Sequence, residues 1–357
     1  MADDFKYHID HHSTLIPPAE LVEARTAKAR GEIDGEILRA KEDQAIRDIL
    51  RAQRRIGLAA VGDGQFRRRN SLAPYYDQID GFGPQKAARG AVAELVGQRL
   101  APEYRPLAGA PKARGRLVAN ETGFLVGAIQ RPLLISLPAP GFVAELTGAS
   151  EADAQTLAAI IHDEIEAIAK DGVAYVQLHN PLAGILLTNA GRDRARLLGL
   201  DPDTILARMR SVDAAVPQGL DVPADFRVGL DLTTSGARYA NQGYDIAATT
   251  AFLTDQAYQR LCVEYPADEQ ARFPIGLLAP GSVVALGIVD VSEPEPEDVD
   301  ELVTRIDEAS SVIEIDDIAI ATNGGFAASG AALSEAEQRA KLQLIEMTAR
   351  YFWGNEL

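Results

Sequence analysis

The sequence predicts an α/β fold built on parallel strands, and the number of strands favours a (β/α)8 barrel. Short apolar runs alternate with helical segments along almost all of the 357 residues, which is typical of repeated βα units. The runs are apolar at nearly every position, as expected for parallel strands that are buried on both faces. The eight predicted strands are 56–61, 117–119, 133–138, 173–178, 226–232, 260–264, 283–289 and 317–321, with a ninth candidate around Tyr7–Ile9.

The segments between these runs have the apolar spacing of amphipathic helices. Ser334 begins the last of them with a Ser-Glu-Ala-Glu capping box. A Rossmann-like sheet is the alternative, but no G-x-G-x-x-G sequence follows a predicted strand. No linker rich in Pro, Gly or Ser divides the chain, so we expect a single domain over residues 1–357. The clearest predicted helices are 35–55, 151–170, 298–309 and 334–353.

Charge and composition exclude several classes of protein. The chain has 35 Lys and Arg against 52 Asp and Glu, a formal charge of −17, which disfavours general binding to nucleic acids or anionic membranes. No window of 18 uninterrupted apolar residues is present, so we expect no membrane-spanning helix. The one cysteine, Cys262, excludes a disulfide framework and a metal site with several thiolate ligands. Together with the lack of a signal segment, it predicts a cytoplasmic protein.

In a (β/α)8 barrel the functional site lies at the C-terminal ends of the strands. Polar and ionisable residues follow most of the predicted strands, although buried charge is costly unless it is paired or used. The candidates in chain order are Asp63, Gln65, Arg67, Gln177, His179, Asn180, Asp231, Thr233, Glu264 and Asn323.

Each of these candidates also has a structural explanation. Asp231 and Glu264 would be structural if they paired with Arg67 or Arg238 to close a layer of the barrel. His179 would be a hydrogen-bonded loop histidine, but its place at a strand end favours a direct role. Of three consecutive arginines we expect one, Arg67, to point inward toward an anionic group of a substrate.

Three histidines, His8, His11 and His12, lie within one short stretch near the start of the sequence. Their spacing does not fix a shared face, because a helix and a strand would group them differently. A metal site here would need a carboxylate from elsewhere, such as Glu264. Histidines clustered near a chain start are more often incidental, so metal binding is the less favoured interpretation.

Several motifs occur in one order along nearly the whole chain: HHSTLIPPAELVEAR, LISLPAPGF, YVQLHNPL, VEYPADEQARF and ATNGGFA. On these motifs the chain resembles the cobalamin-independent methionine synthase family, in particular its short single-barrel members. The resemblance implies a barrel whose mouth binds zinc through a His-x-Cys pair, a Glu, and a Cys that precedes Gly-Phe. Such a zinc ion lowers the proton affinity of a substrate thiol, and the thiolate then accepts a methyl or alkyl group.

The chain departs from the family at the zinc positions. The His-x-Cys pair falls on Asp231 and Thr233, the late Cys falls on Gly324, and the Glu is kept as Glu264. Three of the four ligands that the resemblance implies are therefore replaced.

Other replacements lie nearby in the motifs. Gln65 takes the place of a Glu, His12 takes the place of a Gly, and His179 takes the place of an Asp. Decay of an inactive site would more often leave small or apolar residues, whereas these are polar types with functional chemistry. We therefore interpret the site as retuned.

These observations predict an enzyme that works without a cofactor and without the zinc of the family, on a small polar methylated or thioether substrate. The reaction would be methyl or alkyl transfer, or cleavage of a C–S or other carbon–heteroatom bond. His179 is the expected general acid or base, while Asp231 and Glu264 would orient the substrate, stabilise positive charge or share the proton transfer. The expected substrate-binding residues are His11, His12, Ser13, Asp63, Gln65, Arg67, Gln177, Asn180, Thr233 and Asn323.

Three alternatives stay open. The first keeps the parent activity, methyl transfer to a thiol such as homocysteine from a methyltetrahydrofolate-type donor, with zinc held by His11, His12 and Glu264. The second is a barrel that binds a ligand without catalysis. The third is a cofactor-free lyase like the uroporphyrinogen decarboxylases, which the scarcity of paired arginines at strand ends disfavours. The expected partner is a small molecule, and helix 334–353 offers a face for a homo-oligomer contact.

Overall fold

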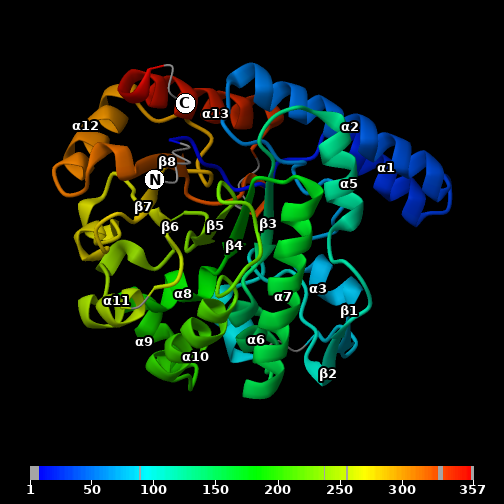
Figure 1. Ribbon diagram of the computed structural model, residues 1–357, viewed down its shortest axis with the longest axis horizontal. Coiled ribbons are helices and arrows are strands. Elements are labelled where there is room, and N and C mark those ends of the chain that lie inside the picture. The colour runs from blue at the N-terminus through cyan, green and yellow to red at the C-terminus, as the bar shows by residue number, and fades with distance from the viewer. Residues whose placement is uncertain (1–7, 88–89, 237, 255, 329–332, 355–357) are drawn as a thin grey trace.

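The computed structural model describes residues 8–87, 90–236, 238–254, 256–328 and 333–354, and it is organised around one parallel sheet (Figure 1). The six strands of the sheet are hydrogen-bonded in chain order. Neighbouring strand ends are level, because Pro138 pairs with His179 and His179 pairs with Asp231. The strands are β3 Leu134–Pro138, β4 Tyr175–His179, β5 Arg227–Asp231, β6 Arg260–Glu264, β7 Val283–Val289 and β8 Ile318–Thr322.

Single parallel bridges extend this sheet at both edges. Ile9 pairs with Ile320 beside β8, and Val61 pairs with Leu133 beside β3. The α/β fold with a parallel sheet is thus confirmed. A closed (β/α)8 barrel is not shown, since no strand pairing within the described ranges joins the segment of Ile9 to the segment of Val61.

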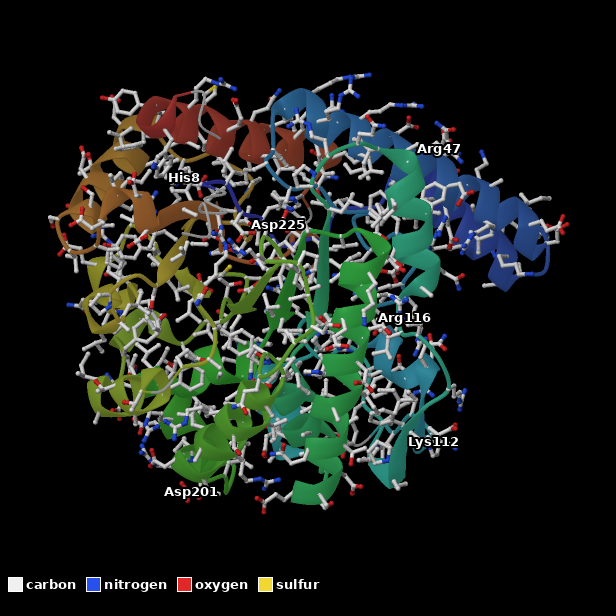
Figure 2. All side chains as sticks on the ribbon, in the orientation of Figure 1. His8, Arg47, Lys112, Arg116, Asp201 and Asp225 are labelled. Atoms are coloured by element: carbon white, nitrogen blue, oxygen red, sulfur yellow. The ribbon has the colours of Figure 1, made fainter. Side chains whose placement is uncertain are left out.

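One predicted strand, 117–119, is wrong. Helix α5 begins at Ala119, and the backbone N–H groups of Leu117 and Val118 donate to the carboxylate of Glu164 on α7, at 2.9 and 3.2 Å. Arg116, labelled in Figure 2, donates to the same carboxylate at 3.0 Å. A side chain therefore satisfies the backbone groups that a neighbouring strand would have bound.

The start of the sequence only partly follows the prediction. Residue Ile56 of the predicted strand 56–61 is the last residue of α2, and Gly57 ends that helix in a left-handed conformation. Val61 is extended and makes the bridge described above. Tyr7, in the ninth candidate strand, lies outside the described residues, whereas Ile9 pairs with β8.

The predicted helices are confirmed, and they surround the sheet (Figure 1). Ser334 caps the last helix with the predicted capping box. No helix in the described ranges carries an apolar stretch long enough to cross a membrane. The α-helices are α1 Ala19–Ala29, α2 Gly35–Ile56, α3 Ala73–Gln78, α4 Ala91–Val96, α5 Ala119–Ala128, α6 Pro140–Thr147, α7 Glu151–Asp171, α8 Pro181–Leu186, α9 Asn189–Leu197, α10 Pro202–Ala215, α11 Ile246–Leu253, α12 Val299–Ser310 and α13 Glu335–Trp353.

A two-stranded antiparallel sheet lies beside the main sheet. It consists of β1 Ile79–Phe82 and β2 Leu107–Ala113. The sequence does not predict it, because most of its residues are exposed or half-buried and lack an apolar alternation. Short 3₁₀ turns occur at Ala240–Gln242, Glu269–Ala271, Ile275–Leu277, Ile315–Asp317 and Phe326–Ala328.

A buried ion pair ties the opening segment of the chain to the first residue of β6. Arg260 Nε lies 2.8 Å from Asp10 Oδ2, and both side chains are almost fully buried. Tyr175 at the start of β4 donates its hydroxyl to the same oxygen at 3.1 Å, and the His11 N–H donates to Asp10 Oδ1 at 2.8 Å. These contacts fix the residues that lead directly to His12.

Replacing Arg260 tests this anchor. Arg260→Leu should lower the free energy of unfolding by about 3–5 kcal/mol, because it leaves the Asp10 carboxylate buried without its cation. The control is Arg51→Ala, which removes an exposed ion pair with Asp48 and should cost under about 1 kcal/mol. Urea unfolding measures both values. Equal losses in the two variants would contradict an anchoring role.

Candidate active site

Three ionisable side chains converge at the C-terminal ends of β4 and β5. His179 and Asp231 are the last residues of these strands, and His12 follows the bridge at Ile9. One ligating atom from each of the three lies within 4.8 Å of the others. The rings of His12 and His179 meet edge to face, with centroids 4.8 Å apart, and His12 Nε2 lies 3.9 Å from Asp231 Oδ2. We call these residues the His12–His179–Asp231 cluster.

Hydrogen bonds orient each member of the cluster. His179 Nε2 lies 2.9 Å from the Thr233 carbonyl, which can only accept, so the neutral ring presents an unprotonated Nδ1. His12 Nδ1 accepts from the Thr14 N–H at 3.3 Å, and its Nε2 is buried without a hydrogen-bond partner. Asp231 Oδ1 accepts from the Thr233 N–H at 2.8 Å and from the Thr233 hydroxyl at 2.7 Å.

Burial dominates the electrostatics of the cluster. It lowers the pKa of His12 well below the ordinary value, and the nearby positive charges of His179, His11 and Arg68 lower this pKa further. Burial also raises the pKa of Asp231, although His179 and the hydrogen bonds from Thr233 act in the opposite direction. Neutral His12 is therefore the favoured form near neutral pH.

The cluster borders a cavity of about 370 Å³, and His12, His179 and Gln65 line it. Among the described residues of its lining, four are arginines and none is Asp or Glu. In a chain with a net charge of −17, this concentration of cations favours an anionic group in the bound molecule. The four arginines are Arg25, Arg68, Arg69 and Arg99.

The arginine that lies in the cavity wall beside the cluster is Arg68, where the sequence led us to expect Arg67. Arg68 forms a buried ion pair with Glu121 at 2.6 Å and donates to the Ser136 carbonyl at 2.8 Å. Arg67 points away, pairs with Asp43 and lies over the ring of Phe124. In a loop the direction of consecutive side chains does not follow from their order, so the choice within the triplet was wrong.

Gln65 and its neighbours form the adjoining wall. Gln65 has a positive φ of 59°, which is an uncommon conformation for a residue with a Cβ. Its side-chain amide donates to Ser13 Oγ at 3.2 Å, and its backbone N–H donates to Asp63 Oδ1 at 2.8 Å. The other oxygen of Asp63 is buried without a hydrogen-bond partner.

Several expected site residues form hydrogen bonds with the surrounding backbone and side chains. His11 has one ring nitrogen 3.1 Å from the His12 carbonyl and the other 3.2 Å from the Ala60 carbonyl. Glu264 Oε1 accepts from the Thr234 N–H and hydroxyl, at 2.7 and 2.9 Å, and neither Arg67 nor Arg238 is its partner in these bonds.

Of the four expected amide side chains, Gln65 lines the cavity and the other three do not. Asn180 caps α8 and donates to Asp213 at 2.7 Å. Asn323 accepts from the Val291 N–H at 3.0 Å. The Gln177 amide lies 3.2 Å from Cys262 Sγ. The structure gives all three a local structural role.

Arg25 is a cavity residue that sequence analysis missed. It lies on α1 and donates to the Phe66 carbonyl. Only the spatial approach of α1 to the strand ends identifies it, and no feature of the sequence singles it out.

Comparisons with known proteins show what this structure is similar to. No family model matches the chain. The chain is 28% identical to the uncharacterized protein YxjH of Bacillus subtilis over 371 aligned residues, which cover 97% of this chain and 95% of that protein. It is 26% identical to the uncharacterized protein YxjG of the same organism, with the same coverage.

Solved structures share the fold at low sequence identity. A putative vitamin-B12-independent methionine synthase from Listeria monocytogenes matches with a TM-score of 0.76 and 20% identity, over 98% of each chain. A B12-independent methionine synthase from Shewanella sp. W3-18-1, solved with selenomethionine, matches with a TM-score of 0.71 and 17% identity, over 90% of each chain. A methyltransferase from Methanosarcina mazei matches with a TM-score of 0.53 and 12% identity, over 97% of this chain and 94% of its own. The structural neighbours are thus cobalamin-independent methionine synthase-like proteins, as the motifs predicted.

The buried carboxyl of Asp63 should make stability depend on pH. Burial, together with the charge of Glu121, raises the pKa of Asp63 from 3.8 to about 6, a difference equivalent to about 3 kcal/mol. The folded protein therefore favours protonated Asp63, and this stabilisation is complete below pH 3.8 and lost as the pH rises through about 6.

Urea unfolding of the wild type and of Asp63→Asn between pH 3.5 and 7 measures this effect. The free energy of unfolding of the wild type, relative to the variant, should fall by up to about 3 kcal/mol across this range. A constant difference between the two proteins would show that Asp63 ionises normally.

Proposed function

We propose that this protein is an enzyme that acts on a small molecule bound in the arginine-lined cavity, by methyl or alkyl transfer or by cleavage of a C–S or other carbon–heteroatom bond. The observation that carries the proposal is the convergence of His12, His179 and Asp231 beside that cavity, whose wall includes the two histidines. The fold shared with methionine synthases and a methyltransferase supports this class of reaction.

The thiolate zinc site of the resembled family does not fit this chain. Thr233 and Gly324 take the place of the two cysteines, and a Cβ on Gly324 would lie 2.3 Å from Ser235 Oγ. The oxygen of Glu264 that bonds Thr234 is already committed. No residue at these positions supplies a soft ligand, so the proposed reaction does not use that site.

His179 is the residue that we assign to contact the reacting group. Its Nε2 is held by the Thr233 carbonyl. The other ring nitrogen, Nδ1, is left to accept a proton. Attraction between His179 and Asp231 lowers the pKa of the carboxyl relative to burial alone. Asp231 thereby stabilises a positive charge that develops on the imidazole.

The arginines of the cavity wall indicate which charged group the proposed substrate carries. Arg69 is paired with Asp77 and Glu103, and Arg68 is paired with Glu121. Arg25 and Arg99 lie in the same wall. Because Arg68 and Arg69 are already paired, we propose that Arg25 and Arg99 bind a carboxylate or another anionic group of the substrate.

We also infer that the parallel sheet curls into a (β/α)8 barrel. The His11 ring lies 3.2 Å from the Ala60 carbonyl, which brings the two edge segments of the sheet together. Such a closure would make the ends of all strands face one mouth.

Replacement of His179 tests the proposed function. The protein is incubated with a panel of small anionic thioethers and methylated amino acids, and the products are followed by mass spectrometry. His179→Ala should lower turnover of any accepted compound by about 10²- to 10⁴-fold, as expected for the loss of proton transfer.

The matched control is His162→Ala, since His162 lies on α7 and bonds the Val216 carbonyl. This variant should keep full turnover. An unchanged rate in His179→Ala would remove the assignment of that residue, and the absence of any product from the panel would favour a non-catalytic binding protein.

A further inference from the structure

We propose that His12, His179 and Asp231 form a binding site for a divalent first-row transition-metal cation, with His12 Nε2, His179 Nδ1 and Asp231 Oδ2 as its ligands. The proposal deepens the proposed function, on which it rests for the place of the site but not for the reaction, because His179 Nδ1 cannot accept a proton while it binds an ion. It differs from the zinc set of the resembled family because it contains no thiolate and does not use Glu264, and because His12 and His179 come from positions outside that set, whereas Asp231 stands at the position of the family's His.

The distances within the cluster suit a single ion. Metal–nitrogen and metal–oxygen bonds of about 2.1 Å separate two ligands of a tetrahedral ion by about 3.4 Å. His12 Nε2 and Asp231 Oδ2 are already 3.9 Å apart, and all three groups offer atoms within 4.8 Å of one another. Small side-chain rotations therefore complete the coordination. Among the described residues this is the one group of three that meets this condition.

His12 Nε2 is the strongest indication that something binds here. The side chain is 5% exposed, and this nitrogen has no hydrogen-bond partner although it faces Asp231. A buried polar atom without a partner destabilises the fold, because the loss of its hydration is not compensated. A bound cation removes that cost and places a positive charge beside the Asp231 carboxylate.

Thr233 supplies the outer contacts that metal ligands require. Its carbonyl holds the Nε2 of His179, so that Nδ1 is the ring nitrogen left to bind a cation, and its N–H and hydroxyl hold one oxygen of Asp231. Ligating imidazoles almost always bond a carbonyl or carboxylate through the second nitrogen in this way. One residue thus positions two of the three ligands.

His12 needs a change of tautomer to coordinate through Nε2, because Nδ1 must then carry the proton. A suitable acceptor lies close by. The hydroxyl of Thr14 is buried without a hydrogen-bond partner. This oxygen and His12 Nδ1 lie 3.2 and 2.8 Å from the position that a Cβ on Gly325 would occupy. A rotation of the Thr14 side chain that brings this hydroxyl to Nδ1 would supply the acceptor, once the 3.3 Å contact with the Thr14 backbone N–H is released.

The ligand types define the class of cation. Two imidazoles and one carboxylate suit borderline divalent ions such as Zn²⁺, Co²⁺ or Fe²⁺, and they do not suit soft Cu⁺. Cys262 is not part of the set, since its thiol is buried and bonded to Gln177. Three protein ligands leave a coordination position open toward the cavity, which is typical of catalytic metal sites.

Metal binding can be measured without an assay for activity. The full-length protein is freed of metal by dialysis against EDTA and titrated with Zn²⁺ by calorimetry and with Co²⁺ by visible absorption. We expect one ion per chain, Co²⁺ bands without thiolate charge transfer, and a higher melting temperature when Zn²⁺ is present.

Variants identify the ligands. Asp231→Asn and His12→Gln should weaken Zn²⁺ binding by at least about 100-fold, and Thr233→Val, which removes the hydroxyl contact, by about 10-fold. His162→Ala and Cys262→Ser should bind as the wild type does. Circular dichroism checks that each variant is folded, and a folded Asp231→Asn that gains no thermal stability from Zn²⁺ supports the site.

Two results would overturn the proposal: folded wild-type protein that binds neither ion at millimolar concentration, or binding that survives both Asp231→Asn and His12→Gln. These outcomes are separate from those of the proposed function. Stoichiometric Zn²⁺ without turnover of any compound would reject only the reaction, whereas turnover in EDTA by protein that binds no metal would reject only the metal site.

Discussion

Asp10 forms a buried ion pair with Arg260, the first residue of β6, and this pair holds the opening segment of the chain against the sheet. The two residues are 250 positions apart, so the contact exists only in the folded chain. His12 lies two residues after Asp10, in a segment further fixed by the stacking of His8 on Trp353 of α13. The candidate site therefore depends on a charge pair that does not itself touch the cavity.

The parallel sheet could be predicted because its strands are buried on both faces, which leaves apolar runs such as 283–289 visible in the sequence. The prediction of a strand at 117–119 failed because the backbone N–H groups of this run donate to the Glu164 carboxylate. No local pattern in the sequence reveals a partner so distant in the chain. The hairpin of β1 and β2 was missed for the opposite reason, since its residues are largely exposed and carry no alternation.

The parts of the site whose positions follow from the strand backbone could be predicted. His179 and Asp231 meet because parallel strands in register end at the same level, and the strand-end rule selects both residues. His12 was expected to bind substrate, but its approach to Asp231 was not predictable, since that approach depends on the long-range anchor of its segment. The choice between Arg67 and Arg68 depends on side-chain directions in a loop, which spacing along the sequence does not determine.

Pro138, His179 and Asp231 occupy matching positions on three adjacent strands. Each strand end is followed by its own loop, so a substitution at one end alters the chemistry of the mouth without shifting the neighbouring backbone. In this architecture the residues at one strand end can change while those at the next strand end stay the same. Proteins that share the fold therefore need not share the same site residues.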